Sequence, residues 1–220
     1  MNNASPQHFD LCIIGAGAAG LSIAAGAAQL GLHVALIEKG KMGGDCLNTG
    51  CVPSKSLLAA AKAAHTIKTA ENFGITTSAP DINFAGVKKH INNVIRAIEP
   101  HDSQERFEGL GVTVIREEAR FTGRNTLQTE NYSISAKHFV IATGSSPVIP
   151  PIEGLEHDKV LTNETIFDLT ERPAHLVIIG GGPIGIEMAQ GFKRLGSKVT
   201  VINQASILPK DDPDLVAALR

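Results

Sequence analysis

The order of apolar and polar stretches along the chain repeats once. Each copy consists of a short apolar strand, a glycine-rich turn, a helix and a second apolar strand. The expected strands cover residues 9–14, 33–37, 175–179 and 198–202, and the expected helices cover residues 18–30 and 184–195. This alternation of strands and helices predicts an α/β fold.

The segment between the two copies is predicted to be helical first and β-rich afterwards. Helices are expected over about 53–70 and 83–109, with Pro100 as an interruption of the second. A strand at 112–115, an antiparallel meander with turns at 123–125 and 130–131, and an apolar strand at 138–142 follow.

A stiff connection formed by Pro147, Pro150 and Pro151 is expected to end the first domain. The sequence therefore predicts one domain over residues 1–150 and the start of a second over residues 151–220.

Each glycine-rich turn has the spacing Gly-x-Gly-x-x-Gly and lies directly between a strand and a helix. The first fingerprint runs from Gly15 to Gly20, and the second from Gly180 to Gly185. Such glycines let the backbone approach a pyrophosphate, which then lies at the N-terminus of the helix. We interpret the two fingerprints as two dinucleotide-binding sites, because strand, glycines, helix and strand in this order are more specific than the glycines alone.

The residue after the second strand distinguishes the two copies. Glu38 stands 18 positions after Gly20, close to the separation expected for a carboxylate that holds a ribose hydroxyl. In the second copy Asn203 stands at this place, followed by Gln204. Neither a carboxylate for NAD nor an arginine for a 2′-phosphate is present, so the choice between NADH and NADPH stays open.

Cys46 and Cys51 are predicted to form a redox-active pair. On an unbroken helix, five positions rise about 7.5 Å, which takes the two Cα atoms beyond the reach of a disulfide. Residues 48–50, Asn-Thr-Gly, form a turn that can bring the sulfurs together. Pro53 suits a first helical turn, so Cys51 is expected near a helix N-terminus, where the dipole favours a thiolate. Lys55, one turn further on, adds a second cation.

Two other interpretations of the cysteine pair are a pair of ordinary loop cysteines and a zinc site. Two cysteines without a second Cys or His pair supply only half of a tetrahedral shell, which disfavours zinc. The eight histidines show no ligand spacing, so no metal site is expected. His33 and Glu38 point to opposite faces of one strand and cannot form an acid–base dyad. Cys12, inside the first strand, is expected to pack in the core.

Composition narrows the class of function. The 220 residues carry 20 Lys and Arg against 22 Asp and Glu, and this balance argues against nucleic-acid binding. No apolar run approaches the roughly 20 residues of a membrane span. Residues 1–8 lack the features of a signal peptide. Three cysteines fit a reducing compartment, and we expect a cytoplasmic location.

Two fingerprints with a Cys-x4-Cys pair just after the first resemble the flavoprotein pyridine nucleotide–disulfide oxidoreductases, in particular the dihydrolipoamide dehydrogenase and mercuric reductase branches. The resemblance runs from Phe9 onward and is most specific over residues 43–55. It implies two Rossmann-like domains of the three-layer ββα type, one for FAD and one, incomplete here, for NAD(P)H. It also implies an enzyme that exchanges electrons with a small-molecule or lipoyl disulfide and forms a homodimer.

The resemblance further implies roles for individual residues. Cys46 would attack the substrate disulfide, Cys51 would lie beside the flavin, and Lys55 would pair with Glu187 near the flavin. Contacts with FAD are implied for Gly15, Gly17, Ala18, Ala19, Gly20, Glu38, Lys39, Gly44, Asp45, Lys55, Ala119, Ala142, Thr143 and Gly144. Contacts with the nicotinamide nucleotide are implied for Gly180, Gly182, Pro183, Ile184, Gly185 and Asn203.

The chain departs from this family in its length. Members of the family are more than twice as long as this chain. After the second fingerprint they supply a Gly-Asp that holds the ribityl chain of the flavin. They end in a dimerisation domain with a His-x4-Glu acid–base pair. The sequence stops at Arg220, so we expect a truncated chain that turns over disulfides poorly alone. The alternatives are a mercuric reductase and, in another class, a non-catalytic FAD-binding redox sensor.

Overall fold

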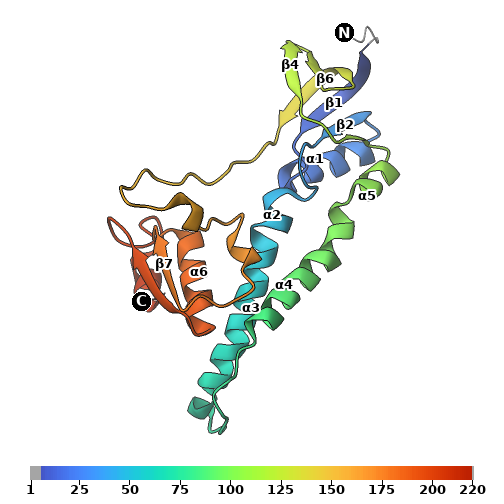
Figure 1. The fold of residues 1–220 in the computed structure, drawn as a ribbon. Helices are drawn as coiled ribbons and strands as arrows, with labels where there is room; N and C mark the ends of the chain where they lie inside the picture. Colours follow the sequence, from blue (N-terminus) through green and yellow to red (C-terminus); the bar gives the residue numbers. More distant parts are fainter. Residues whose placement is uncertain (1–5, 220) are drawn as a thin grey trace. The chain divides into compact units, whose positions relative to one another are not determined.

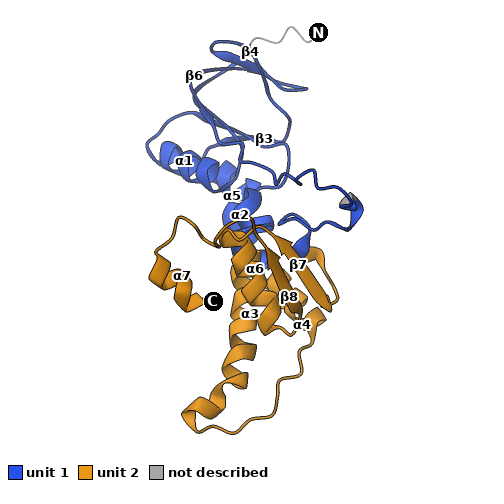
Figure 2. Cartoon of the chain, turned by 90° about the vertical axis from the view of Figure 1, so that its left-hand side faces the viewer, with its two compact units in different colours: residues 1–52, 95–166 blue, residues 53–94, 167–220 orange. Residues whose placement is uncertain are grey.

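The computed structural model describes residues 6–219, which form two compact units. Unit 1 comprises Met1–Val52 and Ile95–Ile166, and unit 2 comprises Pro53–Val94 and Phe167–Arg220 (Figure 2). The units divide the chain differently from the boundary expected near residue 150, because the helical segment 53–94 groups with the C-terminal segment. The functional division into residues 1–150 and 151–220 stays a prediction.

A six-stranded sheet forms the centre of unit 1 (Figure 1). Its strand order is β3-β2-β1-β6-β5-β4. The strands are β1 (Gln7–Ile14), β2 (Val34–Ile37), β3 (Thr113–Ile115), β4 (Arg120–Gly123), β5 (Thr126–Gln128) and β6 (Ser133–Ile141). β1 pairs in parallel with β2 and β6, and β2 pairs in parallel with β3. The predicted α/β class is confirmed.

Strand β6 differs from the expectation of a meander followed by a separate strand at 138–142. It is one continuous strand that pairs with other strands along both of its edges. Its first residues pair antiparallel with β5, which pairs antiparallel with β4 and so gives the predicted meander. Its other edge pairs in parallel with β1 from Ile134 to Ile141. The sequence pattern does not indicate that β6 pairs with both β1 and β5, because the partner of each strand edge is set only when the sheet forms.

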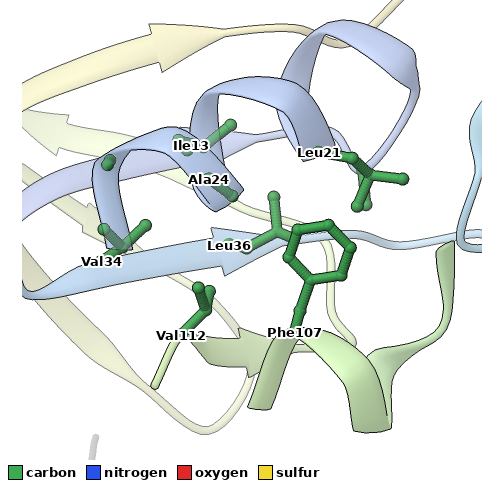
Figure 3. Packing of buried hydrophobic residues seen from close by; sticks show 9 residues of the cluster. Ile13, Leu21, Ala24, Val34, Leu36, Phe107 and Val112 are labelled. Carbon is green, nitrogen blue, oxygen red and sulfur yellow. The ribbon is translucent and has the colours of Figure 1, made fainter. Parts of the chain in front are cut away.

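Two hydrophobic clusters cover the two faces of this sheet. On one face α1 (Ala18–Gln29) and α5 (Gln104–Gly109) pack against β1 and β2, and Phe107 points toward Leu36 (Figure 3). The small residues of α1 allow a close approach of helix and sheet. On the other face Ala35 and Ile37 pack with Leu127 of β5 and residues of β6. Because neighbouring residues of β2 point to opposite faces, the helices cover one face of β2, and residues of β5 and β6 pack against the other.

The helix expected over 83–109 is interrupted, as Pro100 predicted. α4 (Phe84–Ile98) ends before a 3₁₀ helix at Glu99–Asp102, and α5 begins afterwards. Proline lacks the backbone N–H that an α-helix requires, and its ring crowds the preceding turn. The hydroxyl of Ser103 caps α5 by accepting a hydrogen bond from the Arg106 N–H at 3.3 Å.

Unit 2 contains the second copy of the strand–helix–strand pattern. β7 (His175–Ile179) and β8 (Lys198–Ile202) pair in parallel, and α6 (Pro183–Arg194) connects them. α7 (Pro213–Leu219), which was not predicted, follows. By itself, a two-stranded sheet with one helix buries little apolar surface.

Two further helices complete the core of unit 2. α3 (Cys51–Lys68) contacts α6 at Gly191, where an added Cβ would lie 3.3 Å from a methyl carbon of Leu57. From α4, Phe84 packs against Phe192 of α6 with ring centroids 6.0 Å apart. The second copy therefore gains its core from helices that precede it by about 100 residues in the sequence.

Within residues 6–219, no helix is long and apolar enough to cross a membrane. The same residues hold no cluster of three or more His, Cys, Asp or Glu side chains that could bind a metal ion.

Candidate redox and dinucleotide site

The cysteine pair lies where two helices meet in a tight turn. Cys46 belongs to the short helix α2 (Gly44–Asn48), and Cys51 is the first residue of α3. The turn is closed by a hydrogen bond from the Thr49 N–H to the Asp45 carbonyl at 2.9 Å. The Asn48 side chain donates to the carbonyls of Met42 and Gly44 at 3.0 and 2.8 Å. Both cysteines are thiols, and their side chains are hydrogen-bonded to each other.

The Cys46 thiol loses its proton less readily than an ordinary cysteine. The hydrogen bond with Cys51 is the main cause, and partial burial, the charge of Cys51 and the charge of Asp102 also raise the pKa of Cys46. Negative charge beside a thiol disfavours a second negative charge. Cys46 therefore stays protonated to higher pH, and a base that takes its proton would assist any attack by this sulfur.

Alkylation of Cys46 tests this account of its pKa. We expect Asp102→Asn to move the midpoint of the pH–rate profile to lower pH, and Cys51→Ala, which removes the main cause, to move it further. The rate is measured in reduced protein by mass spectrometry of the peptide that contains Cys46. Glu99→Gln, on the same 3₁₀ helix as Asp102, is the matched control and should leave the midpoint unchanged. A midpoint unaffected by both Asp102→Asn and Cys51→Ala would contradict the assigned causes.

The first fingerprint requires glycine at its two ends. Gly15 has a φ of +106°, and an added Cβ would lie 2.2 Å from the Ala142 carbonyl oxygen. An added Cβ on Gly20 would lie 1.8 Å from the Gly15 carbonyl oxygen. Glu38 closes the loop, because its Oε2 accepts a hydrogen bond from the Ala16 N–H at 2.7 Å. The structure thus brings together the glycines, the acid and the end of β6, which are distant in the sequence.

Helix α2 packs directly on this fingerprint. An added Cβ on Gly44 would lie 2.6 Å from the Cα of Gly17, so the two glycines allow a contact between backbones. The Gly43 N–H donates to the Ala16 carbonyl at 2.9 Å. From the next residue of α2, the Asp45 carboxylate lies 3.9 Å from the position of a Cβ on Gly144. The helix that carries Cys46 is therefore fixed against the loop expected to bind a pyrophosphate.

The other residues implied for FAD include Lys39, Ala119, Ala18 and Ala19. Lys39 follows Glu38 and forms an exposed ion pair with Glu118 at 3.7 Å, next to Ala119. Arg116, which the sequence did not single out, donates to the carbonyl of Gly40. The only available signal for Arg116 was its place directly after a buried strand. Ala18 and Ala19 form the first turn of α1, which holds no acidic residue.

The implied ion pair between Lys55 and Glu187 is present within unit 2. Each is the fifth residue of its helix, Lys55 in α3 and Glu187 in α6. The side chain of Lys55 is 62% exposed and that of Glu187 is 35% exposed, so the pair contributes little to stability. Lys55 follows Cys51 by one helical turn.

The second fingerprint has the same backbone form as the first. Gly180 has a φ of +107°, and an added Cβ on Gly185 would lie 2.3 Å from the Gly180 carbonyl oxygen. Gly182 precedes α6, which begins with Pro183 and Ile184 and has no acid in its first turn. Asn203 accepts a hydrogen bond from the Gly181 N–H at 3.1 Å.

Comparison with known proteins agrees with this arrangement. Residues 9–220 match the family described as pyridine nucleotide-disulphide oxidoreductase. The chain belongs to this family. Membership covers both fingerprints and the cysteine pair, and the corresponding Rossmann-like fold is the one described above.

Similar proteins carry several activities in their names. A mercuric reductase from Lysinibacillus sphaericus is 37% identical over 210 residues, which cover 95% of this chain and 38% of the relative. A dihydrolipoyl dehydrogenase from Chlamydia trachomatis is 38% identical over 219 residues, covering 95% of this chain and 46% of the relative. The structure of a Cu(II) complex of the HOCl-induced flavoprotein disulfide reductase RclA from Escherichia coli is similar, with a TM-score of 0.80 and 31% identity over 95% of this chain and 45% of RclA. The chain thus spans less than half the length of these relatives.

Proposed function

We propose that the protein carrying this chain is an FAD-dependent, NAD(P)H-linked disulfide oxidoreductase similar to dihydrolipoamide dehydrogenase. The observation that carries the proposal is the packing of α2, with Cys46, on the first fingerprint through Gly44 and Gly17. A nucleotide bound at that fingerprint would lie beside a pair of thiols. The proposal includes a cytoplasmic homodimer that acts on a small-molecule or lipoyl disulfide.

The residues of the first fingerprint fit the dinucleotide that the family implies. Gly15 leaves a cradle that any side chain would fill, and α1 offers backbone N–H groups without an acidic residue in its first turn. Glu38 has lone pairs left on both oxygens for ribose hydroxyls, although each oxygen already accepts one backbone N–H. These residues would hold the adenosine and pyrophosphate part of FAD. FAD, when bound, would supply two-electron transfer between the nicotinamide and the cysteine pair.

The two thiols divide the disulfide exchange between them. The Cys46 thiolate attacks one sulfur of the substrate disulfide, and the other sulfur leaves as a thiolate that takes up a proton. Cys51 then attacks the sulfur of Cys46, which closes the Cys46–Cys51 disulfide and releases the second substrate thiol. Two electrons pass from the cysteine pair to the substrate. Lys55, paired with Glu187, places a cation one turn after Cys51.

An absorption spectrum of the flavin-loaded protein before and after anaerobic two-electron reduction tests this function. A Cys51 thiolate against oxidised flavin is expected to give a new long-wavelength band. The Cys51→Ser variant should lack the band, whereas Cys12→Ala, a change in the core of the same unit, should retain it. Bleaching of the flavin without the band would show that the cysteine pair is not coupled to it.

A second candidate is the reduction of a soft metal ion. Cys51 is exposed and Cys46 is half-buried, and two adjacent thiolates suit ions such as Hg(II). Relatives named mercuric reductase and the Cu(II) complex of RclA motivate this alternative. Consumption of NADPH with Hg(II), compared with lipoamide under the same conditions, separates the two candidates. A non-catalytic sensor would show oxidation of the cysteine pair with neither substrate turned over.

A further inference from the structure

The two fingerprints differ at one equivalent position. In the first, Glu38 follows β2 and accepts a hydrogen bond from the N–H of Ala16, the second residue of the fingerprint. In the second, Asn203 follows β8 and accepts a hydrogen bond from the N–H of Gly181, which is again the second residue. Glu38 and Asn203 therefore occupy equivalent positions, each in its own fingerprint. At this position a bound dinucleotide presents its adenosine ribose.

The hydrogen-bonding capacity left for a ligand differs sharply between these two side chains. Each oxygen of Glu38 accepts one backbone N–H, from Ala16 at 2.7 Å and Gly40 at 2.6 Å, and keeps a further lone pair. The Nδ2 of Asn203 donates both of its hydrogens, to the carbonyls of Ala205 at 2.9 Å and Ser206 at 3.0 Å. Only one lone pair of its Oδ1 remains, and the side chain carries no charge.

Asn203 cannot easily turn to change this pattern, because the loop after β8 is fixed to the fingerprint at other points. The Leu208 N–H donates to the Gly181 carbonyl at 2.9 Å, and Leu208 itself has a φ of +48°. An added Cβ on Gly181 would lie 2.7 Å from a methyl carbon of Ile207 and 3.1 Å from Asn203. The loop over residues 203–208 therefore closes on Gly181 and holds the amide in place.

We infer that Asn203 makes the second fingerprint permissive for a 2′-phosphate, so that it binds NADPH at least as tightly as NADH. This inference rests on the proposed function. A carboxylate at this position favours NAD, since it accepts the ribose hydroxyls and repels a 2′-phosphate. The amide of Asn203 lacks the repulsive charge and has one acceptor position in place of two. Asn203 is thus the residue that sets the nucleotide preference.

Calorimetric binding of NAD⁺ and NADP⁺ to the full-length protein tests the inference without relying on turnover. NADP⁺ is expected to bind as tightly as NAD⁺ or more tightly. Asn203→Glu is expected to weaken NADP⁺ binding about 10-fold and to strengthen NAD⁺ binding. Gln204→Glu adds the same charge one residue further on and should change the ratio of the two affinities less than about 3-fold.

Two further measurements keep the test independent of folding. Thermal unfolding of each variant identifies a loss of structure, and Asn203→Ala loosens the loop without adding charge, so it should weaken both nucleotides alike. Tighter binding of NAD⁺ than of NADP⁺ in the parent protein would overturn the inference and leave the proposed function standing. An unchanged ratio in a folded Asn203→Glu variant would overturn the role of Asn203. Binding of neither nucleotide would overturn both the inference and the proposed nicotinamide site.

Discussion

Replacement of Cys46 or Cys51 by serine is expected to lower the turnover of a disulfide substrate by at least about 10³-fold in the full-length protein. A serine hydroxyl is a far weaker nucleophile than a thiolate and cannot form the Cys46–Cys51 disulfide that completes each exchange. The two variants should differ in one respect. Cys46→Ser keeps the Cys51 thiol at the start of α3, so the long-wavelength band should persist there and disappear only in Cys51→Ser.

Cys12→Ala is the matched cysteine control for this experiment. Cys12 is fully buried in β1, and burial raises the pKa of its thiol to about 12, so it is inert toward disulfides. The control should keep turnover within about 3-fold of the parent despite a modest loss of stability. Full activity in Cys46→Ser would exclude the proposed exchange, and equal loss in all three variants would point to a defect of folding.

The Gly20→Ala substitution is expected to destabilise unit 1 by about 3 kcal/mol and to weaken flavin binding strongly. The added methyl group would lie 1.8 Å from the Gly15 carbonyl oxygen, and this oxygen is part of the backbone of the fingerprint. The backbone must shift to relieve the overlap, and the approach of α1 to β1 must widen. Thermal unfolding and flavin titration measure the two effects.

Gly26→Ala provides a control within the same helix. Gly26 also lies in α1, but nothing is found within 4 Å of an added Cβ. Alanine has a higher helix propensity than glycine, so this change should stabilise the protein by about 0.5–1 kcal/mol. If Gly20→Ala and Gly26→Ala changed the stability and the flavin affinity equally, the contact between Gly20 and Gly15 would not limit the packing of α1.

Much of the fold could be predicted because its signals are local. The strands β7 and β8 coincide with the predicted ranges, and α1 and α6 begin within one residue of theirs. Strand, fingerprint and helix follow one another directly along the chain, so apolar periodicity and glycine spacing are sufficient. The interruption at Pro100 is equally local, since one residue removes a backbone donor.

The sequence predicted which residues form the candidate site, but it predicted only part of their spatial arrangement. The turn at residues 48–50 indicated that Cys46 and Cys51 approach each other, and their thiols are hydrogen-bonded in the structure. No pattern in the sequence indicated that Asp102, more than 50 residues away, contributes to the raised pKa of Cys46. Arg116 was missed for the same reason, because its partner is a backbone carbonyl brought near by the pairing of β2 and β3.

The sequence by itself determined the elements, the two fingerprints and the identity of the chemical groups, because these depend on residue type and short spacing. Only the tertiary structure decided which of them meet. It placed α2 on the fingerprint through Gly17 and Gly44, and it gave β6 two different partners. It also supplied α6 with a core from α3. These contacts join segments distant in the sequence, and they arise from close packing and backbone hydrogen bonding, which no local pattern records.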